Sequence, residues 1–353
     1  MKTSLKIADF EIKEYSRVFI IAEAGVNHNQ SLDWALQLVD VAVECGADVV
    51  KFQTFKAEEV VTEEGEMASY QQKNMGKQIN QREMLRDLEL PEDFYPHIIE
   101  RCRQREVLFM STPHGGKKSV DFLESLGVKA YKVGSGDLTN YILLDKIAKT
   151  GKPVILSSGM ANLAEVKDAI NFVRAKGNNQ IVMLHSTTNY PTPLEEVNLL
   201  AMKTMMRELD VPVGYSDNGI EGIEVAIMAA ALGAAIYECH FTIDKTLPGP
   251  DHIASANPEE LKAKIEAIRK ASIILGSSEK TPNKSEIESM LTLVRRSIVA
   301  TEDLPAGHML TFDDLEAKRP GDGVQPILYE KFIGRKLKSA IKKDGKIRLE
   351  DLI

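Results

Sequence analysis

Residues 18–23 read VFIIAE, an apolar run that ends in a carboxylate, and seven more apolar runs along the chain also end in polar or charged residues. Continuous apolar runs, unlike alternating ones, indicate strands buried on both faces of a parallel sheet. The eight runs are residues 18–22, 49–50, 108–110, 130–131, 154–156, 181–184, 211–215 and 235–237. Eight strands with helices between them predict an α/β protein, a (β/α)8 TIM barrel, whose active site lies at the carboxyl ends of the strands. The polar residues that end the runs are therefore candidates for chemistry.

The segments between the runs have helical spacing of apolar residues. We expect helices at residues 31–45, where Ser31 is a candidate N-cap, and at 120–126, 164–175, 195–209, 222–232 and 258–275. Residues 3–13 alternate apolar and polar, which predicts a short hairpin or strand that covers the bottom of the barrel. Residues 56–90 form a polar insertion too long for a simple loop, and we interpret it as a candidate lid.

The chain is longer than a minimal barrel of about 250 residues, so a second domain is expected. Residues 276–284 are small and polar, a helix-like stretch runs on to Val294, and short β-like runs separated by Gly and Pro turns follow. We predict a barrel domain at 1–280, a linker at 281–294 and a mostly-β domain at 295–353. So small a domain buries little apolar surface alone and is expected to lean on the barrel or on a partner chain.

Composition excludes several classes of function. A net charge of -8 argues against sequence-independent nucleic-acid binding, which needs a basic surface. No apolar stretch is long enough to span a bilayer, and the first residues carry no secretory signal, so a cytoplasmic protein without a membrane partner is expected. The cysteines, Cys45, Cys102 and Cys239, are few and widely spaced, as reduced thiols are.

Two lysines end the second and fourth runs, and closure of the barrel would point both into one pocket. Lys51 and Lys132 would then hold an anion between them, for which phosphate is the natural choice. A Gly-Ser-Gly turn at 134–136 and hydroxyls at later strand ends (Ser157, Ser186, Thr187, Ser216) would complete a phosphate cradle. The alternative is that one lysine is exposed and the serines only form turns.

Glu23 follows the first run, and His240 ends the eighth predicted strand, beside Glu238. A carboxylate at the end of a buried strand needs a charged partner or a metal, so Glu23 is a candidate acid/base group, a salt-bridge partner of a lysine, or both. A lone histidine is more often structural, but its strand-end position favours a functional His240. A metal held by one or two histidines, a carboxylate and waters would be manganese or magnesium.

Several motifs together resemble the sialic acid synthase family of bacterial nonulosonate synthases. They are IAEAGVNHN at 21–29, VKFQT at 50–54, KVGSG at 132–136, LSSGM at 156–160, YPTP at 190–193 and HFT at 240–242. The resemblance spans nearly the whole chain, and residues 318–321 (KRPG) fall in what resembles the family's C-terminal antifreeze-like (SAF) domain.

The resemblance implies an enzyme that condenses phosphoenolpyruvate with the aldehyde of an N-acylated mannosamine-type sugar, N-acetylmannosamine or 2,4-diacetamido-2,4,6-trideoxymannose, and releases phosphate. It implies Glu23 as the catalytic acid/base, and His240 as a catalytic residue and ligand of Mn²⁺ or Mg²⁺. Phosphoenolpyruvate would be held by Lys51, Thr112, Lys132, Ser135, Ser157, Thr188 and Ser216. The sugar would contact Gln53, Asp137, Tyr190, Asp251 and, from the other chain of a domain-swapped homodimer, Arg319.

One position departs from the family pattern. The family's seventh strand usually ends Ser-Asp-His, with that histidine a second metal ligand, whereas this chain has Asn218. An amide oxygen can bind a hard cation but is a weaker ligand than imidazole for manganese. Asp217 or His252 could compensate. Thr188 and His114 also differ from common family residues and could tune the choice of substrate.

Two other functions stay open at this point. A related phosphoenolpyruvate aldolase would act on a sugar phosphate, for which this chain offers no obvious second basic cluster at strand ends, although Lys117 and Lys118 lie in a suitable loop. A binding or regulatory homologue with an impaired metal site would follow if Asn218 abolished activity.

Overall fold

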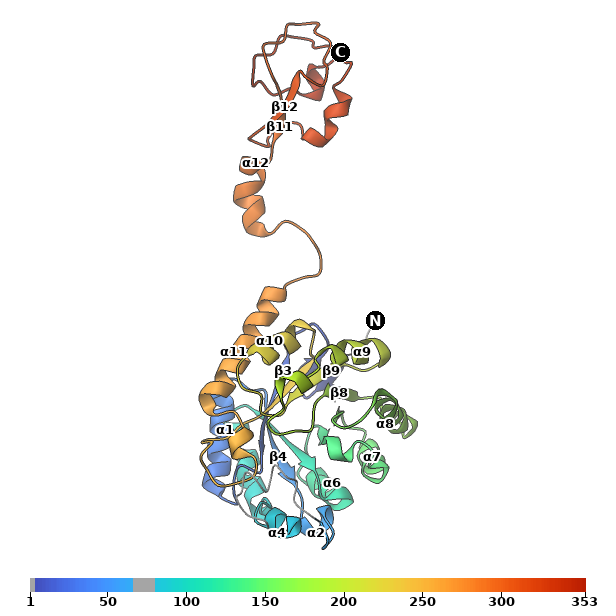
Figure 1. Cartoon of the computed structure of the whole chain (residues 1–353), viewed down its shortest axis with the longest axis vertical. Helices are drawn as coiled ribbons and strands as arrows, with labels where there is room; N and C mark the ends of the chain where they lie inside the picture. The colour runs from blue at the N-terminus through green and yellow to red at the C-terminus, as the bar shows by residue number, and fades with distance from the viewer. Residues whose placement is uncertain (1–3, 66–79) are drawn as a thin grey trace. The chain divides into compact units, whose positions relative to one another are not determined.

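The computed structural model describes residues 4–65 and 80–353, which divide into two compact units, Met1–Gly276 and Ser277–Ile353. The first unit is a barrel of eight parallel strands surrounded by helices (Figure 1). The strands are β3 (Phe19–Gly25), β4 (Val49–Thr54), β5 (Leu108–Pro113), β6 (Tyr131–Val133), β7 (Val154–Ser157), β8 (Ile181–His185), β9 (Val213–Asp217) and β10 (Ile236–His240). Each of the eight predicted runs is therefore a strand, and the predicted barrel is confirmed.

The hydrogen-bonded order is β5-β4-β3-β10-β9-β8-β7-β6, so the first and last strands of the barrel, β3 and β10, pair with each other. β5 and β6 lie in contact without a ladder between them, which leaves the barrel nearly closed. The short antiparallel hairpin β1 (Leu5–Ile7) and β2 (Phe10–Ile12) precedes the barrel. Its Ile7 and Ile12 pack with inward residues of the strands and close the bottom, as the alternating pattern predicted.

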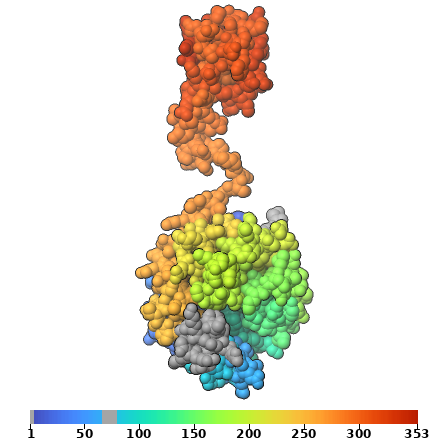
Figure 2. All heavy atoms as spheres, viewed as in Figure 1, coloured from blue at the N-terminus to red at the C-terminus, as the bar shows by residue number. Residues whose placement is uncertain are grey.

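Helices cover the outside of the sheet, except for two short ones, α2 (Ala57–Val60) and α4 (Gln81–Arg86), which lie in the insertion after β4. The covering helices are α1 (Leu32–Cys45), α5 (Tyr95–Gln104), α6 (Gly116–Ser125), α7 (Tyr141–Ala148), α8 (Leu163–Ala175), α9 (Leu200–Glu208), α10 (Glu224–Ala231) and α11 (Pro258–Leu275). Ser31 caps α1 by accepting from the amide of Trp34. In Figure 2 the visible surface of this unit passes from blue through green and yellow to orange, so successive segments of the chain lie next to one another on this face. The helix predicted at 195–209 begins only at Leu200, because residues 194–196 form a 3₁₀ turn and Asn198 has a positive φ of 46°.

Side chains alternate along each strand between the helices and the barrel interior. Phe19, Ile21 and Ile236 belong to the apolar cluster that fills the lower interior. Further along the same strands, the inward positions become polar at Glu23 and at Glu238 and His240. This switch from apolar to polar inward residues sets the floor of a cavity at the carboxyl ends of the strands.

The second unit holds a two-stranded antiparallel pair, β11 (Ser297–Ala300) and β12 (Leu315–Lys318), and its own apolar cluster. A helical segment with a π turn at Glu286–Met290 continues into α12 (Leu291–Val294) ahead of these strands. One of the short β-like runs of the sequence, at residues 336–338, forms isolated bridges at Lys336 and Leu337 instead of a strand. No helix among the described residues has both the length and the apolar character that crossing a membrane requires.

Candidate active site

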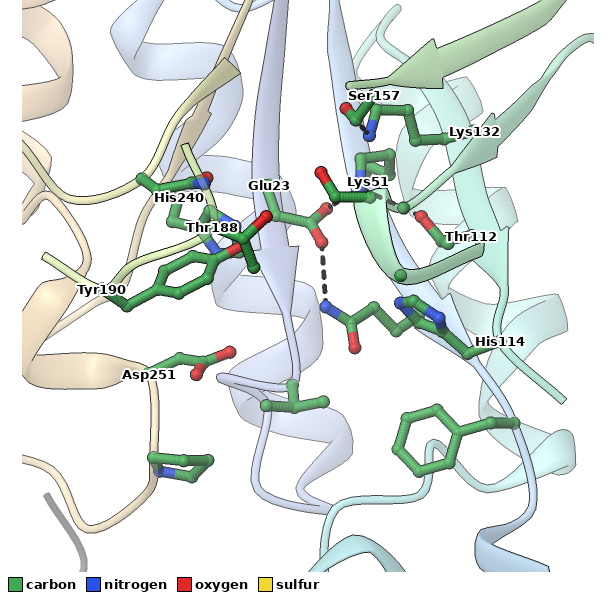
Figure 3. A pocket seen from close by; sticks show the side chains of 18 of the residues that line it. Glu23, Lys51, Thr112, His114, Lys132, Ser157, Thr188, Tyr190, His240 and Asp251 are labelled. Atoms are coloured by element: carbon green, nitrogen blue, oxygen red, sulfur yellow. Dashed lines mark hydrogen bonds and ion pairs between the residues drawn. The ribbon is translucent and has the colours of Figure 1, made fainter. Parts of the chain in front are cut away.

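A cavity of ≈ 390 Å³ opens at the carboxyl ends of the barrel strands. Thirteen of the residues predicted for the site line it: Glu23, Lys51, Gln53, Thr112, Lys132, Ser135, Ser157, Thr188, Tyr190, Ser216, Asn218, His240 and Asp251. Figure 3 shows Lys51, Lys132 and Ser157 on one side of Glu23, with His240, Tyr190 and Asp251 on the other. Parallel strands bring these distant segments together because all eight end at the same rim.

The sheet register places Glu23 beside both of its expected neighbours. Glu23 on β3 pairs with Lys51 on β4 and with His240 on β10. The ammonium of Lys51 lies 2.7 Å from Glu23 Oε2, and Gln53 Nε2 donates to Glu23 Oε1 at 3.2 Å. Lys51 also donates to Thr112 Oγ1 at 3.1 Å. The salt bridge considered for Glu23 is therefore present, and it lies inside the cavity where an acid/base group would act.

A second buried carboxylate, Glu238, completes the charge pattern, and sequence reasoning missed it. Glu238 Oε1 lies 3.4 Å from the ammonium of Lys132 and 3.8 Å from that of Lys51. Ser216 donates to the same oxygen at 3.3 Å, while Lys132 donates to Ser157 at 2.7 Å. Its partner oxygen, Oε2, is buried and has no hydrogen bond from any described residue. The signal was available, because Glu238 has the same inward parity on β10 as His240.

Burial and charge act against each other in this cluster. Burial pushes the pKa of Glu238 upward, but the ammonium groups of Lys132 and Lys51 outweigh it and the net pKa lies below its usual value. Burial lowers the pKa of Lys132, opposed by the charge of Glu238. Two cations and two carboxylates thus occupy the floor of the cavity, and an incoming anion must compete with Glu23 and Glu238 for the lysines.

The turn after β7 is shaped to bring hydroxyls together. The amide of Gly159 donates to Ser135 Oγ at 3.1 Å, and Ser135 Oγ lies 3.1 Å from Ser186 Oγ. A Cβ at Gly159 would lie only 2.1 Å from Thr188 Oγ1, so this position requires glycine. The predicted hydroxyl donors therefore converge on the side of Lys132.

Two predicted sugar contacts lie outside the cavity lining. Asp137 accepts from Asn140 at 3.0 Å and lies 3.2 Å from His114 Nδ1, so His114 stands between Asp137 and the cavity. Burial would raise the pKa of Asp137, but the hydrogen bond to His114 outweighs it and lowers the pKa. Arg319 is exposed and belongs to the second unit.

The neighbourhood of Asn218 and His240 bears on the expected metal. Asn218 Nδ2 donates to Thr187 O at 2.6 Å, which leaves its amide oxygen as the atom available to a ligand. His240 packs edge-on to the Tyr190 ring, and its buried Nδ1 has no hydrogen-bond partner among the described residues. Within residues 4–65 and 80–353, no three His, Cys, Asp or Glu side chains form a metal cluster. One imidazole and one amide oxygen fit a hard cation that keeps most of its waters.

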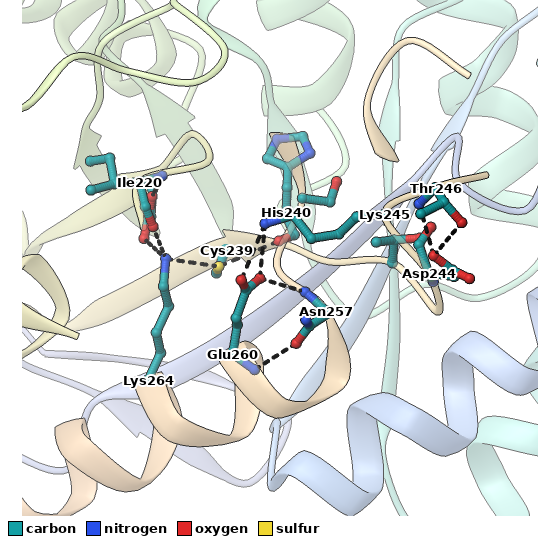
Figure 4. Close-up of polar contacts among 12 residues, drawn as sticks. Ile220, Cys239, His240, Asp244, Lys245, Thr246, Asn257, Glu260 and Lys264 are labelled. Atoms are coloured by element: carbon teal, nitrogen blue, oxygen red, sulfur yellow. Dashed lines mark hydrogen bonds and ion pairs between the residues drawn. The ribbon is translucent and has the colours of Figure 1, made fainter. Parts of the chain in front are cut away.

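Neither residue considered as a substitute ligand lies in the cavity lining. Asp217 has the opposite parity to Asn218 and faces α11, where Lys264 donates to its Oδ2 at 2.7 Å and Tyr237 donates to the same oxygen. Figure 4 shows Lys264 extending from α11 toward Ile220 and Cys239, its other two partners. His252 lies 2.7 Å from Thr242 Oγ1 and 3.2 Å from Asn29 Oδ1. The structure therefore does not support compensation by Asp217 or His252.

Known proteins place this barrel and cavity in a family. The NeuB family model matches residues 38–280 and the SAF domain model matches residues 295–353, so the chain belongs to the NeuB family and carries a C-terminal SAF domain. The resemblance seen in the motifs is thus confirmed.

Several relatives of the chain are named as synthases. The chain is 46% identical to N,N'-diacetyllegionaminic acid synthase of Legionella pneumophila over 90% of each chain. It is 41% identical to the protein of that name from Campylobacter jejuni, over 94% of this chain and 99% of the relative. A crystal structure of N-acetylneuraminic acid synthetase from Leptospira borgpetersenii, in complex with citrate, superimposes with a TM-score of 0.73 at 32% identity, covering 82% of this chain and 96% of that one.

Proposed function

We propose that the protein is a nonulosonate synthase that condenses phosphoenolpyruvate with an N-acylated mannosamine-type sugar and releases phosphate. The observation that carries the proposal is the pair of buried lysines, Lys51 and Lys132, at the floor of the barrel cavity with hydroxyls around them. Ammonium groups and hydroxyls at strand ends are a site for a small phosphorylated acid. The names of the relatives at 46% and 41% identity favour 2,4-diacetamido-2,4,6-trideoxymannose over N-acetylmannosamine as the sugar.

Phosphoenolpyruvate would bind with its phosphate between the lysines. Its phosphate oxygens accept from Lys51 and Lys132, and Thr112, Ser135, Ser157, Thr188 and Ser216 line the same part of the cavity. Binding replaces part of the ion pairing between Lys51 and Glu23, whose atoms lie 2.7 Å apart. Glu23 is then free to exchange a proton with the reacting groups.

The bond changes follow from the substrates. C3 of the enol attacks the carbonyl carbon of the sugar aldehyde, and the carbonyl oxygen takes a proton and becomes a hydroxyl. Water adds at C2, and one of its protons passes through Glu23 to the former carbonyl oxygen. Phosphate leaves with the electrons of the C2–O bond and takes up the second proton of the water, which gives the 2-keto acid. Gln53 donates to Glu23 at 3.2 Å and so fixes the direction of that carboxylate.

A divalent metal, Mn²⁺ or Mg²⁺, belongs to this proposal. His240 and the amide oxygen of Asn218 would hold it, and the ion would polarise the sugar aldehyde as a Lewis acid. Tyr190 packs against His240 with ring centroids 5.3 Å apart at 82°, which holds the imidazole in place. Asp251, whose pKa burial raises, lines the same side of the cavity.

We also propose that the enzyme works as a domain-swapped homodimer in the cytoplasm. Arg319 lies on an exposed turn of the SAF domain, next to Pro320 and Gly321, and a guanidinium there suits the hydroxyls of a sugar in the other chain. Analytical ultracentrifugation that finds only monomers in the active enzyme would contradict this part.

Phosphate release tests the proposed function. The purified protein, mixed with Mn²⁺ and phosphoenolpyruvate, should release phosphate only when a mannosamine-type acceptor is added. Lys132→Met should weaken phosphoenolpyruvate binding at least 100-fold, because a buried charge-assisted contact is lost. Lys118→Met removes an exposed lysine paired with Glu59 and serves as the control. If the unsubstituted protein with Mn²⁺ and phosphoenolpyruvate released no phosphate in response to any mannosamine-type acceptor, the proposal would be refuted.

A further inference from the structure

The mouth of the cavity has two unlike sides. Over β3 and β4, Val26, Phe55, Met84 and Leu88 are buried, pack together and line the cavity; these four residues are called the apolar wall below. Tyr190, Asn218 and Asp251, which follow β8, β9 and β10, line the cavity with polar groups. In a barrel with this strand order β8 lies across from β4. Gln53, which donates to Glu23, and Gln81 also line the cavity beside the apolar wall. A molecule in the mouth therefore meets an apolar patch over β3 and β4, and the hydrogen-bonding groups of Tyr190 and Asn218 lie across from it.

Charge at the mouth also differs from charge at the floor. Among the described residues that line the cavity, the ammonium groups are those of Lys51 and Lys132, and both are paired with the carboxylates of the floor. Three carboxylates line the cavity: Glu23 and Glu238 belong to the floor, and Asp251, next to Pro250, follows β10. A second phosphate in the mouth would find no described lysine or arginine in the lining and would face this carboxylate.

The apolar wall is built by the segments that follow β3 and β4 and not by the barrel strands themselves. Val26 follows β3 and Phe55 follows β4, whereas Met84 lies on α4 and Leu88 just after it, within the insertion at 56–90. Met84 and Leu88 are four residues apart. The phosphate floor is made by strand residues instead, so the wall can differ between proteins without disturbing the floor.

We propose that the apolar wall determines acceptor specificity by packing against the C6 methyl of an unphosphorylated 6-deoxy amino sugar. The proposal rests on the proposed function and adds to it the residues that select the acceptor. A methyl group leaves water and gains contacts on this surface, whereas a hydroxymethyl group would lose its hydrogen bonds to water without a partner there. The polar side is left for the hydroxyl and acetamido groups of the same sugar.

A pair of acceptors that differ at one atom tests this. The ratio of kcat/KM for 6-deoxy-N-acetylmannosamine to that for N-acetylmannosamine should be about 10 to 100 in the full-length protein, since a hydroxyl in an apolar pocket costs about this much. N-acetylmannosamine 6-phosphate should be a poorer acceptor than either sugar. Val26→Thr and Met84→Gln, each close in size to the original residue, should lower the ratio about tenfold by offering the hydroxyl a partner.

Two further variants separate specificity from stability. Met84→Leu keeps the wall apolar and should keep the ratio. Val225→Thr introduces a hydroxyl at a buried position of α10 outside the cavity lining and should also leave the ratio unchanged. A ratio near 1 in the unsubstituted protein, a preference for the phosphorylated sugar, or an equal loss for both acceptors in Val26→Thr and Met84→Gln would overturn the role of the wall while leaving the synthase activity standing. Absence of phosphate release with every acceptor would overturn both.

Discussion

Replacing Glu238 by glutamine isolates the competition between the protein's own carboxylates and the substrate's phosphate. Glu238 is 3% exposed and lies 3.4 Å and 3.8 Å from the ammonium groups of Lys132 and Lys51. Glu238→Gln keeps the shape and the acceptor for Ser216 but removes one negative charge. Among the described residues, Glu23 is then the buried counter-ion left to the two lysines.

Two effects of opposite sign follow. Without ligand, removing one partner of a buried ion pair lowers the free energy of unfolding by about 3–5 kcal/mol. With ligand, Glu238→Gln removes the repulsion between the Glu238 carboxylate and a phosphate bound to the same two lysines. For charges about 4 Å apart, this repulsion amounts to up to about 4 kcal/mol per unit charge at an effective dielectric constant near 20. Even a third of that value is a tenfold change in affinity. We therefore expect phosphoenolpyruvate to bind Glu238→Gln at least tenfold more tightly, and saturating ligand to restore about 2.7 kcal/mol at 100 times Kd.

Isothermal titration calorimetry gives the affinity and urea unfolding gives the stability, each with and without phosphoenolpyruvate. Asp48→Asn is the matched control, because Asp48 is buried and paired with Arg17 and Arg269 away from the cavity. It should lose stability without a change in phosphoenolpyruvate affinity. Unchanged or weaker binding to Glu238→Gln would refute the idea that Glu238 and the phosphate compete for the same lysines.

Three further predictions concern acid, metal and packing. Burial lowers the pKa of both His28 and His252 to about 4 in the folded protein. The unfolded chain, with a histidine pKa near 6.5, takes up protons first, so the free energy of unfolding falls by about 3 kcal/mol per histidine as the pH drops from about 6.5 to 4. Urea unfolding of His252→Gln should therefore show a smaller dependence on pH, whereas the exposed control His97→Gln should leave that dependence unchanged. Asn218→His should bind Mn²⁺ at least tenfold more tightly by calorimetry, and an unchanged Mn²⁺ affinity would show that Asn218 is not part of the metal site. In the unsubstituted protein, EDTA should abolish phosphate release and added Mn²⁺ should restore it. Lys264→Met leaves Asp217 buried without its ammonium partner and should lower the free energy of unfolding by about 3–5 kcal/mol. The double variant Lys264→Met/Asp217→Asn should recover part of this loss in urea unfolding. If the losses of the two single variants simply added in the double variant, Lys264 and Asp217 would not be energetically coupled.

The barrel could be predicted because its signal is local and repeated. Each apolar run is a strand that must be covered on both faces, and the hairpin β1–β2 alternates because one of its faces plugs the barrel. Helix α5 was not predicted, since Tyr95–Gln104 carries a polar sequence with only Tyr95, Ile98 and Cys102 buried. Helix α7 at Tyr141–Ala148 was not predicted either, because it is short and apolar over much of its length.

The site could be predicted where a residue ends an apolar run, because such positions converge in a barrel. Parity along the strand was the information not used. It turns Asp217 outward to Lys264, and it turns Glu238 inward to the two lysines. The apolar wall could not be inferred, because Met84 and Leu88 stand in a polar insertion and meet Val26 and Phe55 only through tertiary folding. The proposed lid lies partly at residues 66–79, outside the described residues.

The origin of the oxygen in the released phosphate tests the central claim most directly. Phosphoenolpyruvate and 2,4-diacetamido-2,4,6-trideoxymannose are incubated with the protein and Mn²⁺ in water enriched in ¹⁸O, and product and phosphate are analysed by mass spectrometry. If water adds at C2 while the lysines hold the phosphate, one nine-carbon 2-keto acid forms per phosphate and the phosphate carries no ¹⁸O. Phosphate that contains ¹⁸O, or that is released without a nine-carbon product, would contradict the account.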